Sequence, residues 1–569
     1  MKAASASAAR AARVSAAAAA ETGGASASGD VDPVGNGERV DDVDEVDNVD
    51  WNFGIGTPNE QVVPEPPPAA SILAPRATQM ARVLFAHGHL LRFDRKQHAI
   101  GKPYPPLATI TAAAYLRSLG HEVALYDPML DEDTRGFAPA LARVRPDVVV
   151  IYDDVFNWFT KMCLGRMREA ALGMIAAARA AGARIVVSGH DSADAPDVYL
   201  QAGADFVAVG EAELTLGELL ARPAGAPPTD VPGLVFRDRG LTRRTGPRAL
   251  LKELETLPLA AWDLVDVDRY RAFWRARHGY FSLNVNTTRG CPYKCNWCSK
   301  PVYGNTYHTR APDDVVAEIR LLRERYAPDR LWFSDDIFGL KARWLLPFSQ
   351  RIAAEGLAMP FLCQTRADLM TEENVAALRR AGCAETWMGV ESGAQSVLDA
   401  MDKGLSLSEV RGAVGRLRAA GIRIGFFLQF GYPGEGWREI GMTRALVREL
   451  APDDIGISVS YPLPGTRFHA RVQAQMGEKR NWTQSDDLDP LFPGLFSRDF
   501  YRRLSRTVHA EFRTRHALRV LRGIATTPRS VDRTALKALG GLAELPLWLA
   551  NTALLHAQVG FGRQKIVPS

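Results

Sequence analysis

The sequence contains few cysteines and carries little net charge. Its 569 residues include six cysteines, and the formal net charge is +4. Six cysteines in a chain of this length do not indicate the disulfide framework that is typical of small secreted domains. A nearly neutral chain gives no reason to expect nucleic acid as a partner. We therefore predict a cytoplasmic protein that does not bind nucleic acid.

The sequence also lacks a long apolar run. A membrane-spanning helix needs roughly 18 consecutive apolar residues, and the longest candidate, Ala535 to Gly560, is interrupted by Lys537, Glu544 and Pro546. The composition, with 46% hydrophobic and 24% charged residues, is that of an ordinary globular protein. We predict no transmembrane segment and, at about 150 residues per domain, three or more domains.

The first 79 residues have little that could form a core. Met1 to Gly29 is rich in Ala and Ser, and Asp30 to Asp50 holds nine acidic residues against one arginine. Such a segment cannot bury enough apolar surface to offset the entropy lost on ordering. Residues 1–79 are therefore predicted to be a disordered tail that can be deleted without loss of cofactor or activity. A true translation start near Met80 is the alternative.

Three of the cysteines stand close together. Cys291, Cys295 and Cys298 form the pattern C-x3-C-x2-C, with no fourth cysteine nearby. Three thiolates on one loop can hold three corners of a cubane iron–sulfur cluster, whose usual protein ligation takes four. The fourth iron then remains open to a ligand that is not protein. Zinc is the alternative, but it prefers four Cys or His ligands, and the nearest histidine is His308. The remaining cysteines, predicted to be buried small hydrophobes, are Cys163, Cys363 and Cys383.

The cysteine run resembles the motif of the radical S-adenosylmethionine (radical SAM) superfamily. This resemblance implies a [4Fe-4S] cluster on Cys291, Cys295 and Cys298, whose open iron chelates the methionine part of S-adenosylmethionine. An electron from the cluster then splits the sulfonium and yields a 5′-deoxyadenosyl radical. An electron donor such as flavodoxin or ferredoxin is implied as a partner.

Short apolar strands alternate with helices from Ala81 onward. We predict strands over residues 82–86, 122–126, 147–152, 184–188 and 204–211, and helices over 107–119 and 167–181. This alternation predicts a doubly wound parallel sheet, Rossmann or flavodoxin-like, with ligands at the carboxyl ends of the strands. Periodicity alone does not indicate which ligand.

A second resemblance suggests the ligand of this sheet. Pro105-Pro106-Leu107, the loop Ser188-Gly189-His190 and the run Gly210-Glu211-Ala212-Glu213 resemble the cobalamin-binding domain that precedes many radical SAM domains. The resemblance covers about residues 81–225. It implies cobalamin contacts from Pro105, Leu107, Asp153, Ser188, Gly189, His190, Gly210 and Glu211.

The signature Asp-x-His-x-x-Gly, which supplies a histidine to cobalt, is absent from this region. His87, His89 and His190 lie in no such context. We therefore predict that cobalamin binds without a histidine from this protein. The alternative is a flavodoxin-like domain that has lost its cofactor.

A second alternating series begins at Phe281. Strands are predicted over residues 282–288, 330–334, 361–365, 385–390, 423–430 and 454–460, and an amphipathic helix over 312–326. Six β/α units suit a partial (β/α)6 barrel, and chemistry at such barrels takes place at the carboxyl ends of the strands. The radical SAM resemblance assigns residues at these ends to S-adenosylmethionine: Trp297, Asp335, Asp336, Arg366, Glu391, Ser392, Gly431, Pro433 and Gly434.

Several of these residues also have simpler roles. Trp297 could serve packing alone, and Arg366 could pair with a neighbouring acid instead of the ligand's carboxylate. Gly431 and Gly434 could form a tight turn as well as allow a close approach of backbone to adenine. These alternatives stay open at the level of sequence.

The C-terminal region is predicted to be helical. Phe500, Leu504, Val508 and Phe512 recur every four residues, with arginines on the other faces, which is typical of an amphipathic helix. Its apolar side is predicted to pack on the barrel; contact of its basic side with a membrane or an acidic substrate is the less favoured alternative. The end of the chain is predicted to form a helical cap that closes the open barrel.

The predicted plan is a tail (1–79), a cobalamin-binding domain (80–225), a linker (226–275), a radical SAM partial barrel (276–470) and a helical cap (471–569). This order implies a cobalamin-dependent radical SAM enzyme. The leading hypothesis is a methyltransferase that moves a methyl group from S-adenosylmethionine via methylcobalamin to an unactivated carbon or phosphorus centre of a small molecule or natural product. The alternative is a radical enzyme that uses the same cofactors for ring formation or rearrangement. A remote alternative is a non-catalytic sensor of cobalamin or redox state.

Overall fold

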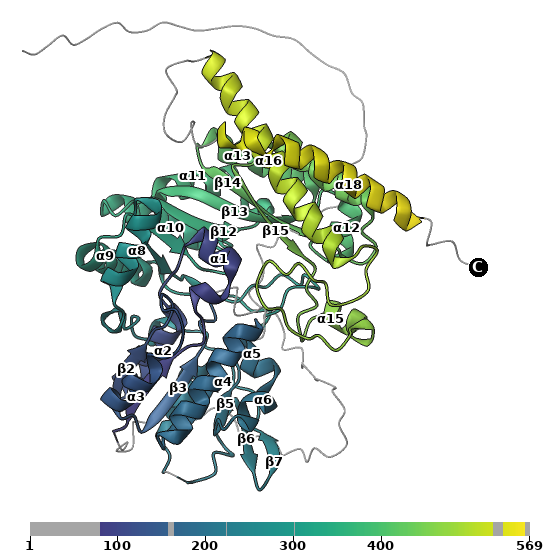
Figure 1. Ribbon diagram of the computed structural model, residues 1–569. Helices are drawn as coiled ribbons and strands as arrows, with labels where there is room; N and C mark the ends of the chain where they lie inside the picture. Colours follow the sequence, from purple (N-terminus) through teal and green to yellow (C-terminus); the bar gives the residue numbers. More distant parts are fainter. Residues whose placement is uncertain (1–79, 157–163, 224, 301, 527–538, 564–569) are drawn as a thin grey trace, which may run out of the picture. The chain divides into compact units, whose positions relative to one another are not determined.

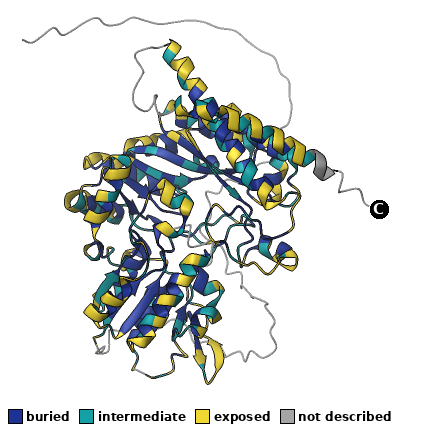
Figure 2. Cartoon of the chain, in the orientation of Figure 1, coloured by how far each residue is buried: buried dark blue, intermediate teal, exposed yellow. Residues whose placement is uncertain are grey.

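The computed structural model describes residues 80–156, 164–223, 225–300, 302–526 and 539–563. The predictions for residues 1–79 and for Cys163 lie outside these ranges. Two large sheets flanked by helices make up most of the described chain, together with a small two-stranded sheet and two long C-terminal helices (Figure 1). The strands of both sheets are largely buried, and most exposed residues lie on the outward sides of the helices (Figure 2).

The N-terminal sheet has seven strands in the order β2-β1-β3-β4-β5-β6-β7. Their bounds are β1 (Arg82–Ala86), β2 (Glu122–Tyr126), β3 (Val148–Tyr152), β4 (Arg184–Ser188), β5 (Phe206–Ala208), β6 (Leu234–Asp238) and β7 (Leu241–Arg244). The first five strands are parallel and follow the flavodoxin-like order 2-1-3-4-5, in which ligands bind at the switch point between β1 and β3. The predicted parallel sheet is confirmed.

The antiparallel strands β6 and β7 extend this sheet beyond residue 225. The strands β6 and β7, which lie in the predicted linker, therefore supply an edge of the N-terminal sheet. The linker that remains is shorter than predicted, because residues up to Arg244 take part in the sheet.

Helices cover both faces of the N-terminal sheet. They are α2 (Leu107–Ser118), α3 (Phe137–Val144), α4 (Gly165–Ala180), α5 (His190–Asp194), α6 (Pro196–Gln201) and α7 (Ala212–Leu220). The short helix α1 (Arg95–Ile100) lies beside the barrel instead (Figure 1). Val83 and Phe85 of β1 belong to one buried cluster with α2 and α7, whereas Leu84 and Ala86 belong to another with α3 and α4. This alternation follows from the two-residue period of a strand.

The second sheet has six parallel strands in the order β15-β14-β13-β12-β11-β8. The strands are β8 (Ser282–Val285), β11 (Arg330–Phe333), β12 (Phe361–Thr365), β13 (Cys383–Glu391), β14 (Arg423–Phe430) and β15 (Asp454–Val459). The helices along it are α8 (Val267–His278), α9 (Pro312–Tyr326), α10 (Ala342–Ala354), α11 (Glu372–Ala381), α12 (Gln395–Ala400), α13 (Leu407–Ala419) and α14 (Trp437–Leu450). All six predicted strands are present, and we refer to this unit as the barrel.

The segment between β1 and α2 contacts both edge strands of the barrel. Lys96 Nζ of α1 donates a hydrogen bond to the carbonyl of Ile457 on β15 (3.4 Å). Asn284 Nδ2 of β8 donates to the carbonyl of Pro105 (3.1 Å). Part of the N-terminal unit thus lies where the C-terminal cap was expected to close the barrel.

The C-terminal helices α16 (Arg498–Thr526) and α18 (Leu545–Arg563) pack on each other. The predicted apolar side of α16 is confirmed, because Phe500, Leu504 and Val508 are buried in the core that includes the barrel strands. Helix α18 reaches the barrel helices through His556, whose ring meets Trp437 of α14 edge-on at 5.2 Å. In the part of the chain that the structure describes, no helix is both long and apolar enough to cross a bilayer.

Candidate functional site

The three motif cysteines lie on one loop whose ends are fixed. Strand β9 (Thr288–Arg289) pairs with β10 (His308–Thr309), so the loop between them leaves and returns at one place. Gly290, just before Cys291, has φ +82 and no room for a Cβ atom beside the Thr306 carbonyl, which only glycine tolerates. Cys291, Cys295 and Cys298 are half-buried free thiols.

Asn296 anchors the middle of this loop. Its backbone N–H donates to the Met401 carbonyl (3.0 Å), and its own carbonyl accepts from Phe468 N (2.9 Å). Its side-chain Nδ2 donates to the Ala400 carbonyl (2.9 Å), while Oδ1 accepts from the Tyr432 hydroxyl (2.9 Å). One residue therefore ties the cysteine loop to three other segments. Sequence reasoning missed it, although a polar residue between Cys295 and Trp297 was a visible signal.

Asp335 holds the segment that precedes the cysteine loop. It is buried and accepts four hydrogen bonds from the N–H and hydroxyl groups of Thr287 and Thr288, at 2.7 to 3.0 Å. Burial raises the pKa of Asp335 to about 6, and these hydrogen bonds act against that rise. Asp335, predicted to contact S-adenosylmethionine, is thus engaged in holding the strand that leads to the cysteines. Asp336, beside it, is exposed.

Two cations flank the cysteine loop. Lys403 Nζ pairs with Glu391 (2.9 Å) and lies 5.9 Å from the centre of the Trp297 ring. The Arg366 guanidinium stacks 3.7 Å from the centre of the Tyr293 ring and donates to the Lys403 carbonyl (3.0 Å). Burial lowers the pKa of Lys403, but Glu391 and then Cys295 more than offset this and raise it above its usual value. Burial raises the pKa of the Cys291 thiol, and the charge of Lys300 acts against that rise.

Several predicted ligand residues have partners within the protein. Arg366 Nε donates a hydrogen bond to Asp368 (3.0 Å). The alternative that Arg366 pairs with a neighbouring acid is therefore observed. The hydroxyl of Ser392 lies 3.1 Å from that of Thr443 on α14. Glu391 has φ +60, an uncommon value for a side chain larger than glycine and one that is often found at functional sites.

The loop after β14 forms a tight turn. Gly431 and Gly434 have φ of +83 and +91, and a Cβ on Gly431 would lie 2.9 Å from the Tyr501 ring. Glu435 Oε2 accepts from Gly431 N (2.5 Å), and burial raises the pKa of Glu435 to about 8. Pro433 is partly exposed at the tip of this turn. The turn is thus observed, and an approach of adenine to it stays a prediction.

Buried polar atoms without a partner gather in the barrel. Among the described residues, these atoms include Trp297 Nε1, Trp332 Nε1, Asn284 Oδ1, Gln429 Oε1 and Ser460 Oγ. They lie on the cysteine loop, on strands β8, β11 and β14, and just after β15. Because buried polar groups are nearly always hydrogen-bonded, this set fits a polar molecule bound inside the barrel. Gln429 and Ser460 were not predicted.

The donor set of the loop does not resemble a zinc site. In the described parts of the chain, no three His, Cys, Asp or Glu side chains converge as a single metal ion requires. A structural zinc site needs four ligands at 2.0–2.3 Å. Three half-buried thiols of one loop, with cations beside them, fit the corners of a larger iron–sulfur cluster.

The switch point of the N-terminal sheet brings several predicted cobalamin residues together. A Cβ on Gly189 would lie 2.8 Å from the Asp153 Cβ, and Asp153 N donates to the Ser188 carbonyl (2.9 Å). Burial raises the pKa of Asp153 to about 6. His190 Nε2 lies 3.3 Å from the Val155 carbonyl. The other predicted residues are Leu107, buried at the start of α2, Pro105, which accepts from Asn284, and Gly210, with open space at its Cβ position.

The ring of His87 is engaged on both sides. Its Nε2 lies 3.0 Å from Asp127 Oδ1, and its Nδ1 accepts from His89 N (3.2 Å). Neither nitrogen faces a ligand in this arrangement. The absence of a protein histidine on cobalt stays a prediction, and the geometry of His87 is consistent with it.

Glu211 lies in a buried ion-pair cluster with the residue that leads into the cysteine loop. Arg289 Nη1 donates to Glu211 (2.8 Å) and Nη2 donates to Glu213 (2.7 Å), and all three side chains are at least 95% buried. Glu211 also accepts from Leu251 N (2.5 Å). Both oxygens of Glu211, predicted to contact cobalamin, are thus occupied. We call Arg289, Glu211 and Glu213 the buried clamp.

Comparison with known families identifies the barrel. Residues 285–447, from the end of β8 into α14, match the radical SAM superfamily. The barrel of this protein is therefore similar to the radical SAM domain. Members of the superfamily use a [4Fe-4S] cluster and S-adenosylmethionine, so the predictions of these two cofactors and of an enzyme are confirmed.

Relatives match about 70% of this chain. An uncharacterized methyltransferase of Pyrococcus horikoshii is 25% identical over 402 residues, which are 69% of this chain and 84% of that protein. The radical SAM methyltransferase TsrM from Kitasatospora setae, solved with cobalamin and a [4Fe-4S] cluster, has a TM-score of 0.57 at 21% identity and covers 70% of this chain and 75% of its own.

A second solved structure extends the comparison. The cobalamin-dependent radical enzyme OxsB, solved with aqua-cobalamin and S-adenosylmethionine, has a TM-score of 0.63 at 17% identity. The match covers 84% of this chain and 72% of OxsB. At such identities TsrM and OxsB show that the fold is shared, and they do not by themselves assign a substrate.

Proposed function

We propose that this protein is a cobalamin-dependent methyltransferase of the radical SAM superfamily. It transfers a methyl group from S-adenosylmethionine to an unactivated carbon or phosphorus centre of a small molecule. The single observation that carries the proposal is the combination of a flavodoxin-like sheet and a three-cysteine barrel in one chain, a fold shared with TsrM and OxsB. Cluster and cobalamin supply the radical and methyl-transfer chemistry, and the protein supplies position and electrostatics.

We assign different binding roles to different residues of the cysteine loop. Cys291, Cys295 and Cys298 hold the cluster, and Asn296 keeps their loop in place. Trp297 offers an unpaired indole N–H toward S-adenosylmethionine.

The residues at the carboxyl ends of β12 and β13 form the second part of the proposed S-adenosylmethionine site. Glu391, held by Lys403, supplies a carboxylate there. Arg366 and Ser392 hold these strand ends in place through hydrogen bonds with Asp368 and Thr443.

The cobalamin site is proposed at the β1/β3 switch point. Asp153, Ser188 and Gly189 meet there, and Gly210 leaves open space at the end of β5. Glu211 is assigned to the buried clamp instead, because Arg289 and Leu251 occupy its oxygens. A protein electron donor remains part of the proposal, since a cluster held by the three cysteines would need an electron from outside this chain.

The proposal is tested with S-adenosylmethionine carrying a deuterated methyl group. Protein reconstituted with iron, sulfide and hydroxocobalamin is reduced and incubated with a small-molecule extract. We expect a deuterated methyl group in a product, with S-adenosylhomocysteine and 5′-deoxyadenosine in a ratio near one. Formation of 5′-deoxyadenosine without S-adenosylhomocysteine would instead favour the cyclase or rearrangement alternative.

Cysteine variants test the cluster separately from the substrate. Replacing Cys291, Cys295 and Cys298 by alanine should remove the roughly four irons per chain of a cubane cluster and its thiolate-to-iron absorption. The matched control is Cys383→Ala, because Cys383 is a buried cysteine on β13 outside the loop. A triple variant that retained a full cluster would contradict the assignment.

A further inference from the structure

The strands of the barrel have two different faces. On one face, Ile424 and Phe426 of β14 are buried in the core that the strands share with the surrounding helices. Gly425, Phe427 and Gln429 lie on the other face, because successive side chains of a strand point to opposite sides. Strands β12 and β15 show the same alternation of buried and half-buried residues. The second face is therefore the inner side of the barrel.

Two aromatic rings lie on this inner face with glycine around them. Phe427 has Gly389 and Gly456 as its neighbours on the two adjoining strands. Trp387 has Gly425 beside it. A Cβ on Gly456 would lie 3.3 Å from both rings, and a Cβ on Gly425 would meet the Trp387 ring. The rings therefore lie flat over glycine backbone, which larger residues at these positions would not allow.

The two rings form one aromatic surface that stays partly open. Their centres are 4.8 Å apart and their planes are inclined at 35°. Trp387 Nε1 donates to Glu385 (2.7 Å), so the edge of the indole is engaged and its face remains for another partner. Both rings are half-buried, whereas Phe426 on the helix-facing side is fully buried. We call Trp387 and Phe427 the aromatic pair.

Polar atoms without a partner lie beside the aromatic pair. Gln429 follows Phe427 by two residues on the same face of β14, and Ser458 of β15 is its neighbour. Among the described residues, Gln429 Oε1 and Ser460 Oγ are buried and have no hydrogen-bond partner. A buried acceptor that lacks a donor costs free energy. The arrangement therefore suits a ligand that carries a polar group next to an aromatic ring.

The aromatic pair lies further inside the barrel than the residues proposed for S-adenosylmethionine. Trp387 precedes Glu391 by four residues on β13, a span of about 13 Å at roughly 3.3 Å per residue. Glu391 is paired with Lys403 beside the cysteine loop. A molecule on the aromatic pair thus lies between the middle of the strands and the proposed S-adenosylmethionine site, with Gln429 on the side of that site.

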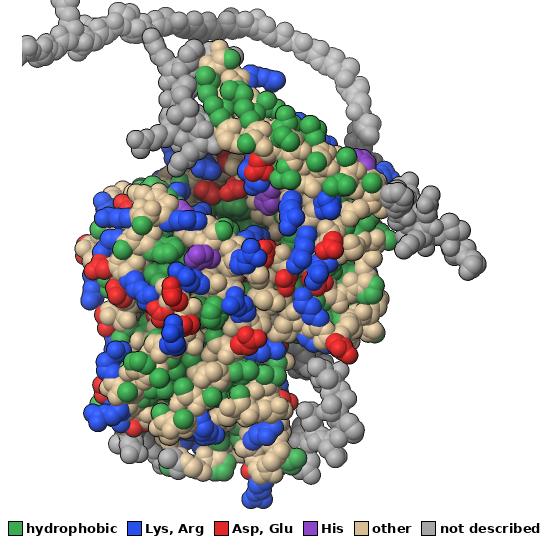
Figure 3. All heavy atoms as spheres, in the orientation of Figure 1, with side chains coloured by type: hydrophobic (Ala, Val, Ile, Leu, Met, Phe, Trp, Pro, Cys, Tyr) green, Lys and Arg blue, Asp and Glu red, His purple; other side chains and the backbone are tan. Residues whose placement is uncertain are grey.

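The amino ends of the neighbouring strands face water. Asp453 and Asp454, at the start of β15, are exposed. Figure 3 shows acidic and hydrophobic side chains together in a hollow below α16, where Figure 1 places β13 and β14. This end of the strands is therefore open to solvent.

We propose that the aromatic pair binds a planar conjugated ring of the substrate, and that a hydroxyl or amino group on this ring donates to Gln429. The inference rests on the proposed function, whose substrate class it names. Aromatic rings attract one another beyond the area that they bury, whereas a saturated ring gains from buried area alone. The pair therefore selects flat rings over puckered rings of equal size.

The test uses 2-naphthol and its saturated counterpart decahydro-2-naphthol, which share a two-ring skeleton and one hydroxyl. Each is titrated by calorimetry into the reconstituted protein with cobalamin and saturating S-adenosylmethionine, without a reductant. We expect 2-naphthol to bind about threefold to tenfold more tightly. Equal affinities, or binding of neither, would overturn the proposal. Binding of 2-naphthol that S-adenosylmethionine abolishes would show that the pair holds adenine, and would overturn it as well.

Variants of the aromatic pair locate the preference. Phe427→Leu keeps an apolar side chain and should lower the preference for 2-naphthol, and its combination with Trp387→Leu should abolish it. The matched control is Phe206→Leu, because Phe206 is a half-buried phenylalanine on β5 whose ring meets that of Phe236 at 6.0 Å. The control should keep the full preference. A double variant that kept it too would overturn the proposal.

Gln429→Leu tests the polar half of the site. It should weaken binding of both probes about threefold to tenfold, since each loses the acceptor for its hydroxyl, and it should leave the preference for the planar ring unchanged. An unaltered affinity for 2-naphthol would overturn the assignment of Gln429. Iron content and circular dichroism of each variant should match those of the wild type and so confirm its folding.

These binding measurements involve no turnover, so they stand apart from the test of methyl transfer. If methyl transfer is not found but the planar preference is, the proposed function is wrong and the aromatic site remains. A methylated product without a conjugated ring would support the proposed function and overturn the assignment of the aromatic pair to the substrate.

Discussion

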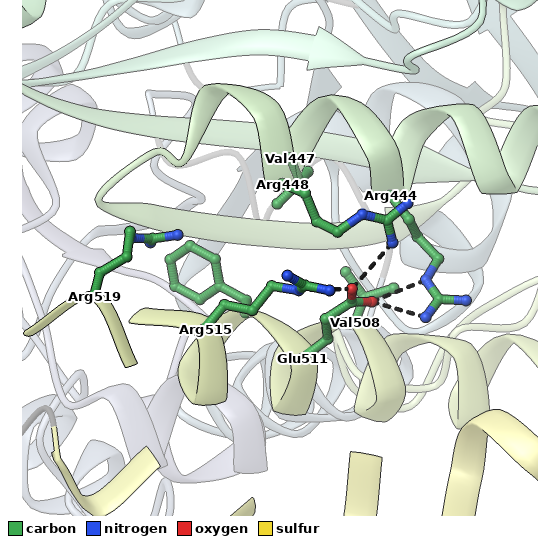
Figure 4. A pocket seen from close by; sticks show the side chains of 8 residues that line it. Arg444, Val447, Arg448, Val508, Glu511, Arg515 and Arg519 are labelled. Atoms are coloured by element: carbon green, nitrogen blue, oxygen red, sulfur yellow. Dashed lines mark hydrogen bonds and ion pairs between the residues drawn. The ribbon is translucent and has the colours of Figure 1, made fainter. Parts of the chain in front are cut away.

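The buried clamp and a group formed by Glu511 with Arg444, Arg448 and Arg515, which we call the arginine cluster (Figure 4), both join arginine to glutamate, but they are built in opposite ways. In the clamp, one arginine meets two glutamates and all three side chains are at most 5% exposed. In the cluster, three arginines meet one glutamate, and Arg448 and Arg515 are 37% and 40% exposed. Charges in the clamp depend on one another, whereas two arginines of the cluster also face water, although Arg444 and Glu511 are buried.

Because of this difference in burial, we expect the two groups to have different roles. Taking a charge out of water is costly, so a buried ion is tolerated only where its partners are in place. Arg289 lies two residues before Cys291 and is held by Glu211 and Glu213, which follow β5 of the N-terminal sheet. The clamp therefore links the sheet that we propose for cobalamin to the start of the cysteine loop.

The largest expected effect comes from breaking the clamp. Arg289→Met leaves two buried carboxylates without a cation, and we expect a loss of about 3–5 kcal/mol in the free energy of unfolding. The matched change in the arginine cluster, Arg448→Met, should cost less than about 1 kcal/mol, because that arginine is partly solvated. Urea unfolding followed by circular dichroism measures both, and iron content after reconstitution reports on the cysteine loop.

A third variant separates the missing charge from the missing packing. Combining Arg289→Met with Glu211→Gln and Glu213→Gln removes all the charge of the clamp and should recover part of the lost stability. If Arg289→Met were no more destabilising than Arg448→Met, the contrast between the two groups would be wrong.

The strands were predictable because their signals are local. The predicted ranges of β1, β2, β4, β12 and β14 agree with the structure at both ends. Each is an apolar run bounded by turn or charged residues, and a buried strand needs little more. The cysteine loop was equally visible, since all three cysteines lie within eight residues.

The clamp was not predictable, because its partners are far apart in the chain. Glu211 and Arg289 are separated by 78 positions, and a local motif does not show which distant residue fills a carboxylate. The Gly-Glu-Ala-Glu run was therefore interpreted through its resemblance alone, as a ligand contact. Asn296 and Gln429 were missed for the same reason: their roles depend on segments that only the fold brings together.

Glu435 is a buried carboxylate with no arginine beside it among the residues that the structure describes, which makes it a third case to compare with the clamp and the cluster. Glu435 has an Oε1 atom with no partner among the described residues, and burial raises its pKa to about 8. The folded protein keeps this proton across a range in which the unfolded chain, with a pKa near 4.5, releases it. The free energy of unfolding should therefore fall as pH rises through this window.

Glu435→Gln removes that pH dependence. We expect the variant to match the wild type near pH 5 and to exceed it by on the order of 1–3 kcal/mol near pH 8. Thermal unfolding across this pH range measures the difference. The control is Glu478→Gln, an exposed glutamate that should change nothing. A constant difference between variant and wild type at every pH would exclude the buried proton as its cause.

The smallest expected effect is the response of each group to salt. Double-mutant cycles isolate the coupling between Arg448 and Glu511 in the arginine cluster and between Arg289 and Glu213 in the buried clamp. The first coupling should be below about 1 kcal/mol and should lose more than half its value when NaCl is raised from about 0.05 M to about 0.5 M, because the Debye length shortens and water reaches the pair. The second should hardly change, since its side chains are at most 5% exposed and mobile ions do not reach them. Equal losses at both pairs would mean that water enters the clamp, and the cysteine loop would then lack the rigid support that its position beside Arg289 implies.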